Sequence, residues 1–206
     1  MGTLTVGMFV TLDGVMQAPG APDEDREGGF GHGGWTVPHF DDQLGEFMVE
    51  LTGRTGALLL GRKTYEIFAA SWPLVGDDDP IGAKLNTVPK YVASTTLRTA
   101  DWNNTTLLTG DVAQEVRNLK QRLDTEIQVA GSGQLVQTLL RHELVDRLTL
   151  LVFPVLLGSG KRLFADGTVP TGLRLVDTAT SGSGVVISTY ERTGAPTYGQ
   201  LGPEFG

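Results

Sequence analysis

The spacing of hydrophobic residues changes several times along the chain and predicts strands that alternate with helices. Apolar residues alternate with other residues from Leu4 to Val10 and stop at the turn Leu12-Asp13-Gly14, which is typical of a strand entering a turn. Between residues 40 and 51 they recur at helical spacing, and residues 57–60 form the short apolar run of a buried strand. The same criteria predict helices around residues 65–68, 112–123 and 135–140, and strands over residues 91–93, 127–130, 148–157, 173–177 and 184–191.

Strand and helix alternate through most of the chain, and the last two predicted strands follow without a helix between them. This order favours an α/β fold with a mixed, mostly parallel central sheet and antiparallel additions. The segment Leu148–Leu157 is too apolar for an edge strand, so it is expected inside the sheet. Residues 17–38, rich in Gly, Pro and acid, form a long loop after the first strand. Such a loop is either an active-site lid or a tolerated surface insertion.

Composition limits the classes of protein that the chain can belong to. Its 206 residues fit one domain, expected over residues 1–192, followed by a loose tail over residues 193–206. The net charge of −8 and the absence of a basic cluster argue against a nucleic-acid or membrane partner. With no cysteine, the chain has neither disulfides nor thiol chemistry. No membrane-length apolar run and no signal peptide is visible, so a cytoplasmic location is expected.

Three predicted strands end in small or polar residues, which is where open α/β sheets bind ligands. Gly61-Arg62-Lys63-Thr64 places two cations at a helix start, a position that favours acids unless an anion lies there. Gly131-Ser132-Gly133 lets the backbone approach a pyrophosphate and turn into a helix. Ser94-Thr95 offers hydroxyls for a phosphate. Each has a plainer interpretation: solvated cations, a ligand-free strand–helix turn, and hydroxyls that cap a turn.

Longer segments around these strand ends carry a family resemblance. LLLGRKTYEIF is similar to the strand–helix unit of dihydrofolate reductases, and VTLDGVMQAPG resembles the start of the riboflavin-biosynthesis reductase domain. The most specific segment, IQVAGSGQLVQTLLRHELVDRLTLLVFPVLLGSGKRLF, is similar to the glycine turn, helix and long strand of the same group. The chain therefore resembles the RibD C-terminal domain family from about residue 3 to 191. That resemblance implies a three-layer dihydrofolate reductase-like fold with helices on both faces of the sheet.

The resemblance also implies a site for NADPH. The backbone around Phe9 and Val10 would lie by the nicotinamide, and the phosphates and adenosine would meet Gly61, Arg62, Lys63, Thr64, Ser94, Thr95, Gly131, Ser132, Gly133, Gln134 and Leu135. The chain departs from the family at two of these positions. Many relatives carry Arg where this chain has Thr95, so preference for the 2′-phosphate rests mainly on Arg62 and Lys63. Ser132 replaces the middle glycine of the turn.

The substrate side of the site gives weaker signals. Dihydrofolate reductases hold the pterin through a helix carboxylate, but the equivalent position here is Gly45, which argues against dihydrofolate. Asp13 matches the Leu-Asp-Gly of the riboflavin-type relatives and is the candidate catalytic and substrate-binding residue. The alternative role is that of an acid accepting hydrogen bonds from turn N–H groups. Trp35 and Phe47 are candidates to stack on a flat substrate, or belong to the core. No metal site is expected.

These signals favour an NADPH-dependent reductase acting on a small heterocyclic substrate, pteridine- or pyrimidine-like, or on a carbonyl compound. A non-catalytic nucleotide- or drug-binding protein on the same fold remains an alternative. A genuine riboflavin-pathway reductase is a third, disfavoured because the deaminase domain usually joined to it is absent and the 17–38 loop is long. Relatives of this type are often homodimers, so a homodimer is expected, with Leu148–Leu157 as a candidate interface.

Overall fold

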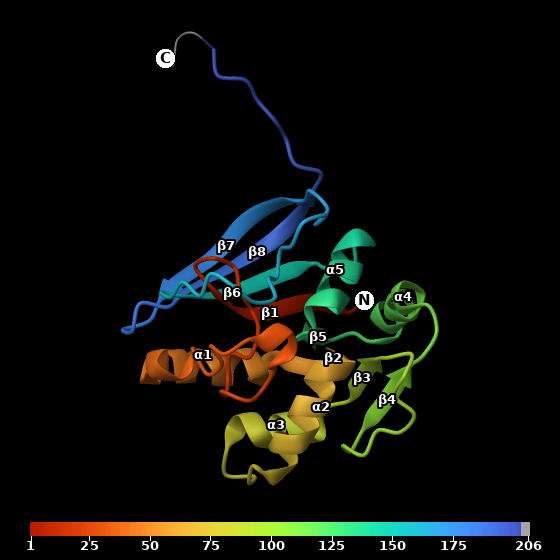
Figure 1. The fold of residues 1–206 in the computed structure, drawn as a ribbon. Helices are drawn as coiled ribbons and strands as arrows, with labels where there is room; N and C mark the ends of the chain where they lie inside the picture. Colours follow the sequence, from red (N-terminus) through yellow and green to blue (C-terminus); the bar gives the residue numbers. More distant parts are fainter. Residues whose placement is uncertain (203–206) are drawn as a thin grey trace.

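The computed structural model describes residues 1–202 and shows one eight-stranded sheet with helices on both faces (Figure 1). The strands are β1 (Thr3–Thr11), β2 (Thr55–Gly61), β3 (Lys90–Ala93), β4 (Thr105–Leu108), β5 (Glu126–Val129), β6 (Arg147–Phe153), β7 (Gly172–Thr180) and β8 (Val186–Gly194). The helices are α1 (Asp42–Arg54), α2 (Arg62–Ser71), α3 (Pro80–Thr87), α4 (Val112–Arg122) and α5 (Gly133–Arg141). Short 3-10 helices cover Glu27–Gly29, Val37–His39 and Trp72–Leu74.

The strands follow the order β4-β3-β2-β5-β1-β6-β8-β7. All neighbours from β4 to β6 run parallel, whereas β8 pairs antiparallel with both β6 and β7. The mixed, mostly parallel sheet predicted from the order of elements is therefore confirmed. Because β1, β2 and β5 are parallel neighbours, their carboxyl ends meet at one edge of the sheet.

Alternate side chains of β1 pack into two hydrophobic cores, one on each face of the sheet. Leu4, Val6 and Met8 are buried in the core that α4 and α5 cover. Phe9 points to the opposite face, where it packs with Leu44 of α1 and with Phe153. The period of two thus places one row of β1 side chains under α4 and α5 and leaves Phe9 on the face of α1 and α2.

Two elements, α3 and β4, were not visible in the spacing of hydrophobic residues. The helix α3 has eight residues and follows an acidic run that suggested a loop. It begins where the Asp79 carboxylate accepts hydrogen bonds from the backbone N–H groups of Ile81 and Gly82, with Pro80 at the first position. The strand β4 has only four residues, mostly half exposed. Both elements depend on capping and sheet pairing more than on a hydrophobic period.

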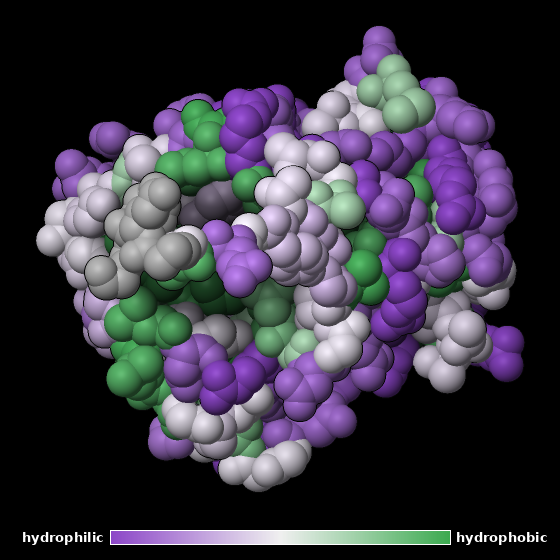
Figure 2. Space-filling view, turned by 90° about the horizontal axis from the view of Figure 1, so that it is seen from above, coloured by the Kyte–Doolittle hydropathy of each residue, from purple (hydrophilic) through white to green (hydrophobic). Residues whose placement is uncertain are grey.

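The segment Leu148–Leu157 lies mostly inside the sheet. Its strand, β6, pairs with β1 on one side and β8 on the other, and Leu148, Leu151 and Phe153 are buried. The interior position predicted for this segment is confirmed for β6, whereas Leu156, after the strand, is 70% exposed, and the interface role of the segment stays a prediction. Exposed apolar side chains also lie on β7 and β8, at Leu173, Leu175, Val176 and Val186. The view from that side shows hydrophobic surface around a hollow (Figure 2).

The end of the described chain carries no further helix or strand after β8, which runs to Gly194. The predicted tail begins at residue 193, inside β8, and its last four residues, 203–206, lie outside the described residues. Within residues 1–202, no helix has the length and hydrophobicity that crossing a bilayer requires.

Candidate functional site

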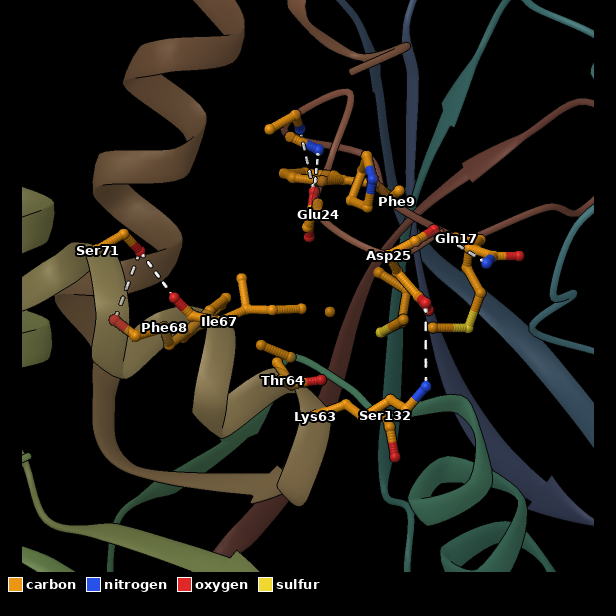
Figure 3. Close-up of a pocket in the computed structure, with 18 of the residues that line it drawn as sticks. Phe9, Gln17, Glu24, Asp25, Lys63, Thr64, Ile67, Phe68, Ser71 and Ser132 are labelled. Carbon is orange, nitrogen blue, oxygen red and sulfur yellow. Dashed lines mark hydrogen bonds and ion pairs between the residues drawn. The ribbon is translucent and has the colours of Figure 1, made fainter. Parts of the chain in front are cut away.

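A cavity of about 1250 Å³ opens at the carboxyl ends of β1, β2 and β5. Its volume exceeds the range of about 300–1,000 Å³ typical of a site for one small ligand. Side chains from α1 and α2 line one side, and the start of α5 and the loop after β1 line the other. Figure 3 shows Ile67, Phe68 and Ser71 of α2 on one side and Asp25 and Gln17 of the loop on the other. The cavity thus lies where open α/β sheets bind ligands.

Two helices begin at this cavity, and both begin without a side-chain cap. Within residues 1–202, α1, α3 and α4 are capped by the carboxylates of Asp41, Asp79 and Asp111. By contrast, α2 begins at Gly61 and α5 at Ser132 without a side-chain hydrogen bond, and neither carries an acid in its first turn. Their N–H groups and partial positive charge are therefore available to an anion.

Glycines bring the two helix starts close together. The backbone N–H of Gly61 donates to the carbonyl oxygen of Gly131 over 3.0 Å, so the turns after β2 and β5 are joined. Gly131 has a φ of +132°, and a Cβ there would lie 2.6 Å from the Thr64 hydroxyl oxygen. A Cβ on Gly61 would lie 2.4 Å from the Ser132 hydroxyl oxygen. Only glycine fits at these two positions, and the result is one cradle made from two helix N-termini.

The other part of the cavity is apolar. Phe9 makes edge-to-face contacts with Phe40 and Phe153, at 6.3 and 5.5 Å between ring centroids. Further apolar lining comes from Met48, Leu51, Leu58, Ile67, Phe68 and Leu151. Gln128 of β5 is a buried polar residue among them: it is 7% exposed and lines the cavity, and its Oε1 has no hydrogen-bond partner within residues 1–202. A Cβ at Gly7 would lie 2.2 Å from the Gln128 amide nitrogen, so Gly7 makes room for this side chain.

The loop after β1 covers the cavity and is held in place by buried hydrogen bonds. The Gln17 amide nitrogen donates to the carbonyl oxygens of Asp25 and Glu27 over 3.1 and 3.0 Å, and its Oε1 accepts from the Lys161 backbone N–H. The Trp35 indole N–H donates to the Gln17 carbonyl oxygen over 2.8 Å. We call residues 16–27, most of which line the cavity, the lid.

Four charged side chains join the lid to the cavity wall. Lys161, in the loop after β6, donates to the carboxylates of Asp25 and Glu27 over 2.5 and 2.7 Å. Lys63, in the first turn of α2, pairs with Glu27 and lies 3.9 Å from Asp25. Burial and the neighbouring Lys161 lower the pKa of Lys63. Two cations from distant parts of the sequence therefore share the same two lid carboxylates (Figure 3 shows Lys63 and Asp25).

The structure brings five of the predicted cofactor residues to the cavity. Phe9, Lys63, Thr64, Ser132 and Gly133 line it, and Gly61 and Gly131 form the turns beneath it.

Other predicted cofactor residues lie outside the lining. The Val10 side chain is buried on the α4–α5 face, and Leu135 is buried in the same core. Gln134 is exposed, and Arg62, which does not itself line the cavity, pairs over 2.9 Å with Glu66, which does. Arg62 therefore lies at the rim of the cavity.

Ser94 and Thr95 also lie away from the cavity lining. The Ser94 hydroxyl oxygen accepts hydrogen bonds from the backbone N–H groups of Thr96 and Leu97 over 3.2 and 2.9 Å. This is the turn-capping arrangement that such a hydroxyl commonly adopts after a strand. Thr95 is exposed.

Asp13, the predicted catalytic and substrate residue, lies outside the cavity lining. Its carboxylate accepts hydrogen bonds from the Thr11 hydroxyl at 2.5 Å and from the backbone N–H groups of Gly158 and Leu157 at 2.8 and 3.3 Å. The Thr11 bond and these N–H bonds lower the pKa of Asp13 to about 2. Asp13 does not line the cavity, and with this lowered pKa its carboxyl group is ionised at neutral pH. Its contacts join the end of β1 to the loop after β6, and its catalytic role stays a prediction.

Trp35 and Phe47 do not present a stacking surface to the cavity either. Trp35 is 7% exposed and packs edge-to-face on Phe153 at 5.3 Å between centroids. Phe47 packs on the same core cluster from α1. Neither lines the cavity, because both side chains fill the core that supports the lid and α1.

Three functional candidates were missed in the sequence. Lys161 lies in a glycine-containing loop after a strand, which is the kind of position that pointed to Lys63. Because the two lysines are far apart in the sequence, no local pattern indicated that both contact the same lid carboxylates. Gln128 is a polar residue in an otherwise apolar strand, and that interruption marked it. For Gln17, inside the long loop, the sequence offered no signal.

Comparison with known proteins agrees with this architecture. The sequence matches the RibD C-terminal domain over residues 2–187. It is 29% identical over 194 residues to YyaP of Bacillus subtilis (strain 168), which is described as uncharacterized, covering 93% of this chain and 95% of that one. The fold is similar to a putative riboflavin biosynthesis protein from Shewanella sp. PV-4, with a TM-score of 0.67, 20% identity, and coverage of 93% and 99%. It is also similar to a dihydrofolate reductase from Enterococcus faecalis complexed with NADP(H) and RAB-propyl, with a TM-score of 0.58, 16% identity, and coverage of 93% and 97%.

The sheet and its cavity define an open α/β protein with a dihydrofolate reductase-like fold and a ligand site at the carboxyl ends of its strands. Because the family match spans nearly the whole chain, the protein belongs to the RibD C-terminal domain family. The family resemblance seen in the sequence is confirmed.

Proposed function

We propose that this protein is an NADPH-dependent reductase that transfers hydride to a small heterocyclic substrate, pteridine- or pyrimidine-like, or to a carbonyl compound. The observation that carries the proposal is the pair of uncapped helix N-termini at the cavity, whereas the other three α-helices within residues 1–202 have carboxylate caps. A pyrophosphate suits such a cradle because its oxygens accept hydrogen bonds from free N–H groups. The family and its reductase neighbours favour the same class.

The residues present fit a dinucleotide. Gly61 and Gly131 allow close approach of the backbone, Thr64 and Ser132 offer hydroxyls, and Lys63 offers a positive charge. When bound, NADPH supplies the hydride. The protein orients the phosphates at the cradle, and the apolar surface around Phe9 excludes water from the reacting end.

The apolar part of the cavity favours a flat, uncharged substrate. Phenylalanine and aliphatic side chains supply contact area, and the Gln128 amide is a polar group without a partner for its Oε1 that a ring nitrogen or carbonyl could meet. In the segment of α1 that contributes Met48, Leu51 and Thr52, no carboxylate reaches the cavity. The protein's own acidic lining residues are Glu66 and the lid carboxylates Asp23, Glu24, Asp25 and Glu27.

This shortage of acids in the apolar part is the observation that favours the second candidate, a non-catalytic nucleotide- or drug-binding protein on the same fold. The two candidates differ in turnover. A reductase oxidises NADPH in the presence of some heterocyclic or carbonyl compound, whereas a binding protein retains its ligand unchanged.

The substitution Ser132→Asp tests the cradle directly. A carboxylate at this position would cap α5 as Asp111 caps α4, and it would repel a phosphate. We expect NADPH binding, measured by isothermal titration calorimetry, to weaken by about tenfold or more, with no loss of thermal stability. Ser132→Ala, which removes the hydroxyl without adding charge, should weaken NADPH much less. NADPH affinity unchanged in Ser132→Asp would show that the phosphates do not bind at these helices.

A further inference from the structure

The lid carboxylates lie where two lysines would otherwise face the cavity together. Lys63 and Lys161 come from segments about a hundred residues apart, yet both lie within 4 Å of Asp25 and Glu27. With the lid in place, two positive and two negative charges balance. Without it, two cations remain beside Ser132 and Gly133 at the start of α5, in a wall that carries the partial positive charge of two helix ends.

The four side chains are partly exposed, from 19% for Asp25 to 57% for Glu27, and exposed ion pairs contribute little by themselves. In this protein, however, the Gln17 amide fixes the carbonyl oxygens of both Asp25 and Glu27. Gln17 itself is 4% exposed. The lid therefore presents its two carboxylates to the lysines in a fixed geometry, which reduces the entropy lost in forming the pairs.

A carboxylate and a phosphate use the same chemistry toward an ammonium group, since anionic oxygens accept short, charge-assisted hydrogen bonds from it. Lysine is also a common point-charge partner for phosphate. Lys161 and Lys63 thus form an anion site, and the carboxylates of Asp25 and Glu27 from the same chain occupy it.

We propose that Lys161 and Lys63 form a phosphate-binding pair and that Asp25 and Glu27 of the lid occupy it in the unliganded protein. A phosphate-bearing ligand displaces the two carboxylates, and its binding releases the lid from the cavity wall. The proposed function supplies the identity of that ligand, a dinucleotide, whereas the anion site itself rests on the geometry of the four side chains. Burial and then the neighbouring Lys161 lower the pKa of Lys63, which is consistent with a site that needs an anion.

Calorimetric titration of the full chain with inorganic pyrophosphate and with NADPH tests this inference. Glu27→Gln removes the carboxylate that touches both lysines, so we expect both ligands to bind about five- to tenfold more tightly. Lys161→Met should weaken both by about tenfold. Glu50→Gln is the matched control: Glu50 pairs with Arg54 on α1 and does not line the cavity, so the same change of net charge should leave binding nearly unchanged.

The outcomes separate this inference from the proposed function. Pyrophosphate binding that Glu27→Gln strengthens and Lys161→Met weakens, without any NADPH binding, would leave the anion site standing and remove the reductase proposal. NADPH binding that is equal in the wild type, Glu27→Gln and Lys161→Met would overturn the anion site and leave the reductase proposal standing. Equal effects of Glu27→Gln and Glu50→Gln would show a general charge effect and overturn the displacement mechanism. Absence of pyrophosphate binding in both wild type and Glu27→Gln would overturn it too.

Discussion

Replacing Asp13 by asparagine separates a structural role from a catalytic one. The carboxylate ties the end of β1 to the loop after β6 through Thr11, Leu157 and Gly158, and Arg162 lies 3.6 Å away. These contacts lower the pKa of Asp13 from 3.8 to about 2 in the folded protein. A difference of about 1.8 units at about 1.36 kcal/mol per unit gives about 2 kcal/mol of stabilisation at neutral pH. For a chain of this length, the loss corresponds to roughly 4–8 °C in Tm.

The sign of the pH dependence follows from the lowered pKa. The stabilisation by Asp13 is fully present above pH 3.8 and is lost as the pH falls toward 2, because protonation then occurs in the folded state as well. Urea unfolding of wild type and Asp13→Asn should therefore differ by about 2 kcal/mol at pH 7 and converge as the pH falls below 4. NADPH affinity should stay the same. Equal stability at pH 7 together with lost turnover would refute the structural role and return Asp13 to the mechanism.

Three further predictions concern other parts of the molecule. Burial lowers the pKa of Lys90 from 10.5 to about 8, so between pH 8 and pH 10.5 the unfolded chain binds more protons than the folded one. The free energy of unfolding of wild type, measured in urea, should therefore rise relative to that of Lys90→Met from pH 8 to pH 10. Parallel pH curves would contradict this. Arg62→Ala should weaken NADPH about tenfold and NADH little, because Arg62 lies outside the cavity where a 2′-phosphate would extend; equal weakening in fluorescence titrations would remove that role. If the exposed apolar face of β7 forms a homodimer, wild type should scatter light as a dimer and Leu175→Lys as a monomer; a wild-type monomer would exclude this interface.

Much of the fold could be predicted because its strands and helices have clear periods. The alternation in β1, the apolar run in β2 and the helical stripes of α4 and α5 each fixed an element within a few residues. The elements that were missed, α3 and β4, are short and depend on an Asp79 cap or on pairing with β3. The polar residues in and around α3 and β4 favoured loops, so neither element was predicted from the sequence.

Only those parts of the site that consist of residues close together in the sequence could be predicted from it. The turns around Gly61 and Gly131 are contiguous segments, and the structure joins them as one cradle. The role of Asp13 was harder to predict, because an acid after a strand can either face a ligand or accept hydrogen bonds from backbone N–H groups. Its partners Leu157 and Gly158 are also distant in the sequence. The convergence of Lys161 on the lid likewise depends on tertiary packing that no local pattern encodes.

The most direct test of the central claim is a titration of the wild-type protein with NADPH and NADH, followed by tryptophan fluorescence. Trp72 lines the cavity and should report a bound dinucleotide. We expect both cofactors to quench the tryptophan fluorescence saturably, with clearly tighter binding of NADPH. Absence of binding by either cofactor at millimolar concentration would contradict a dinucleotide site at these helices and favour the non-catalytic ligand-binding protein.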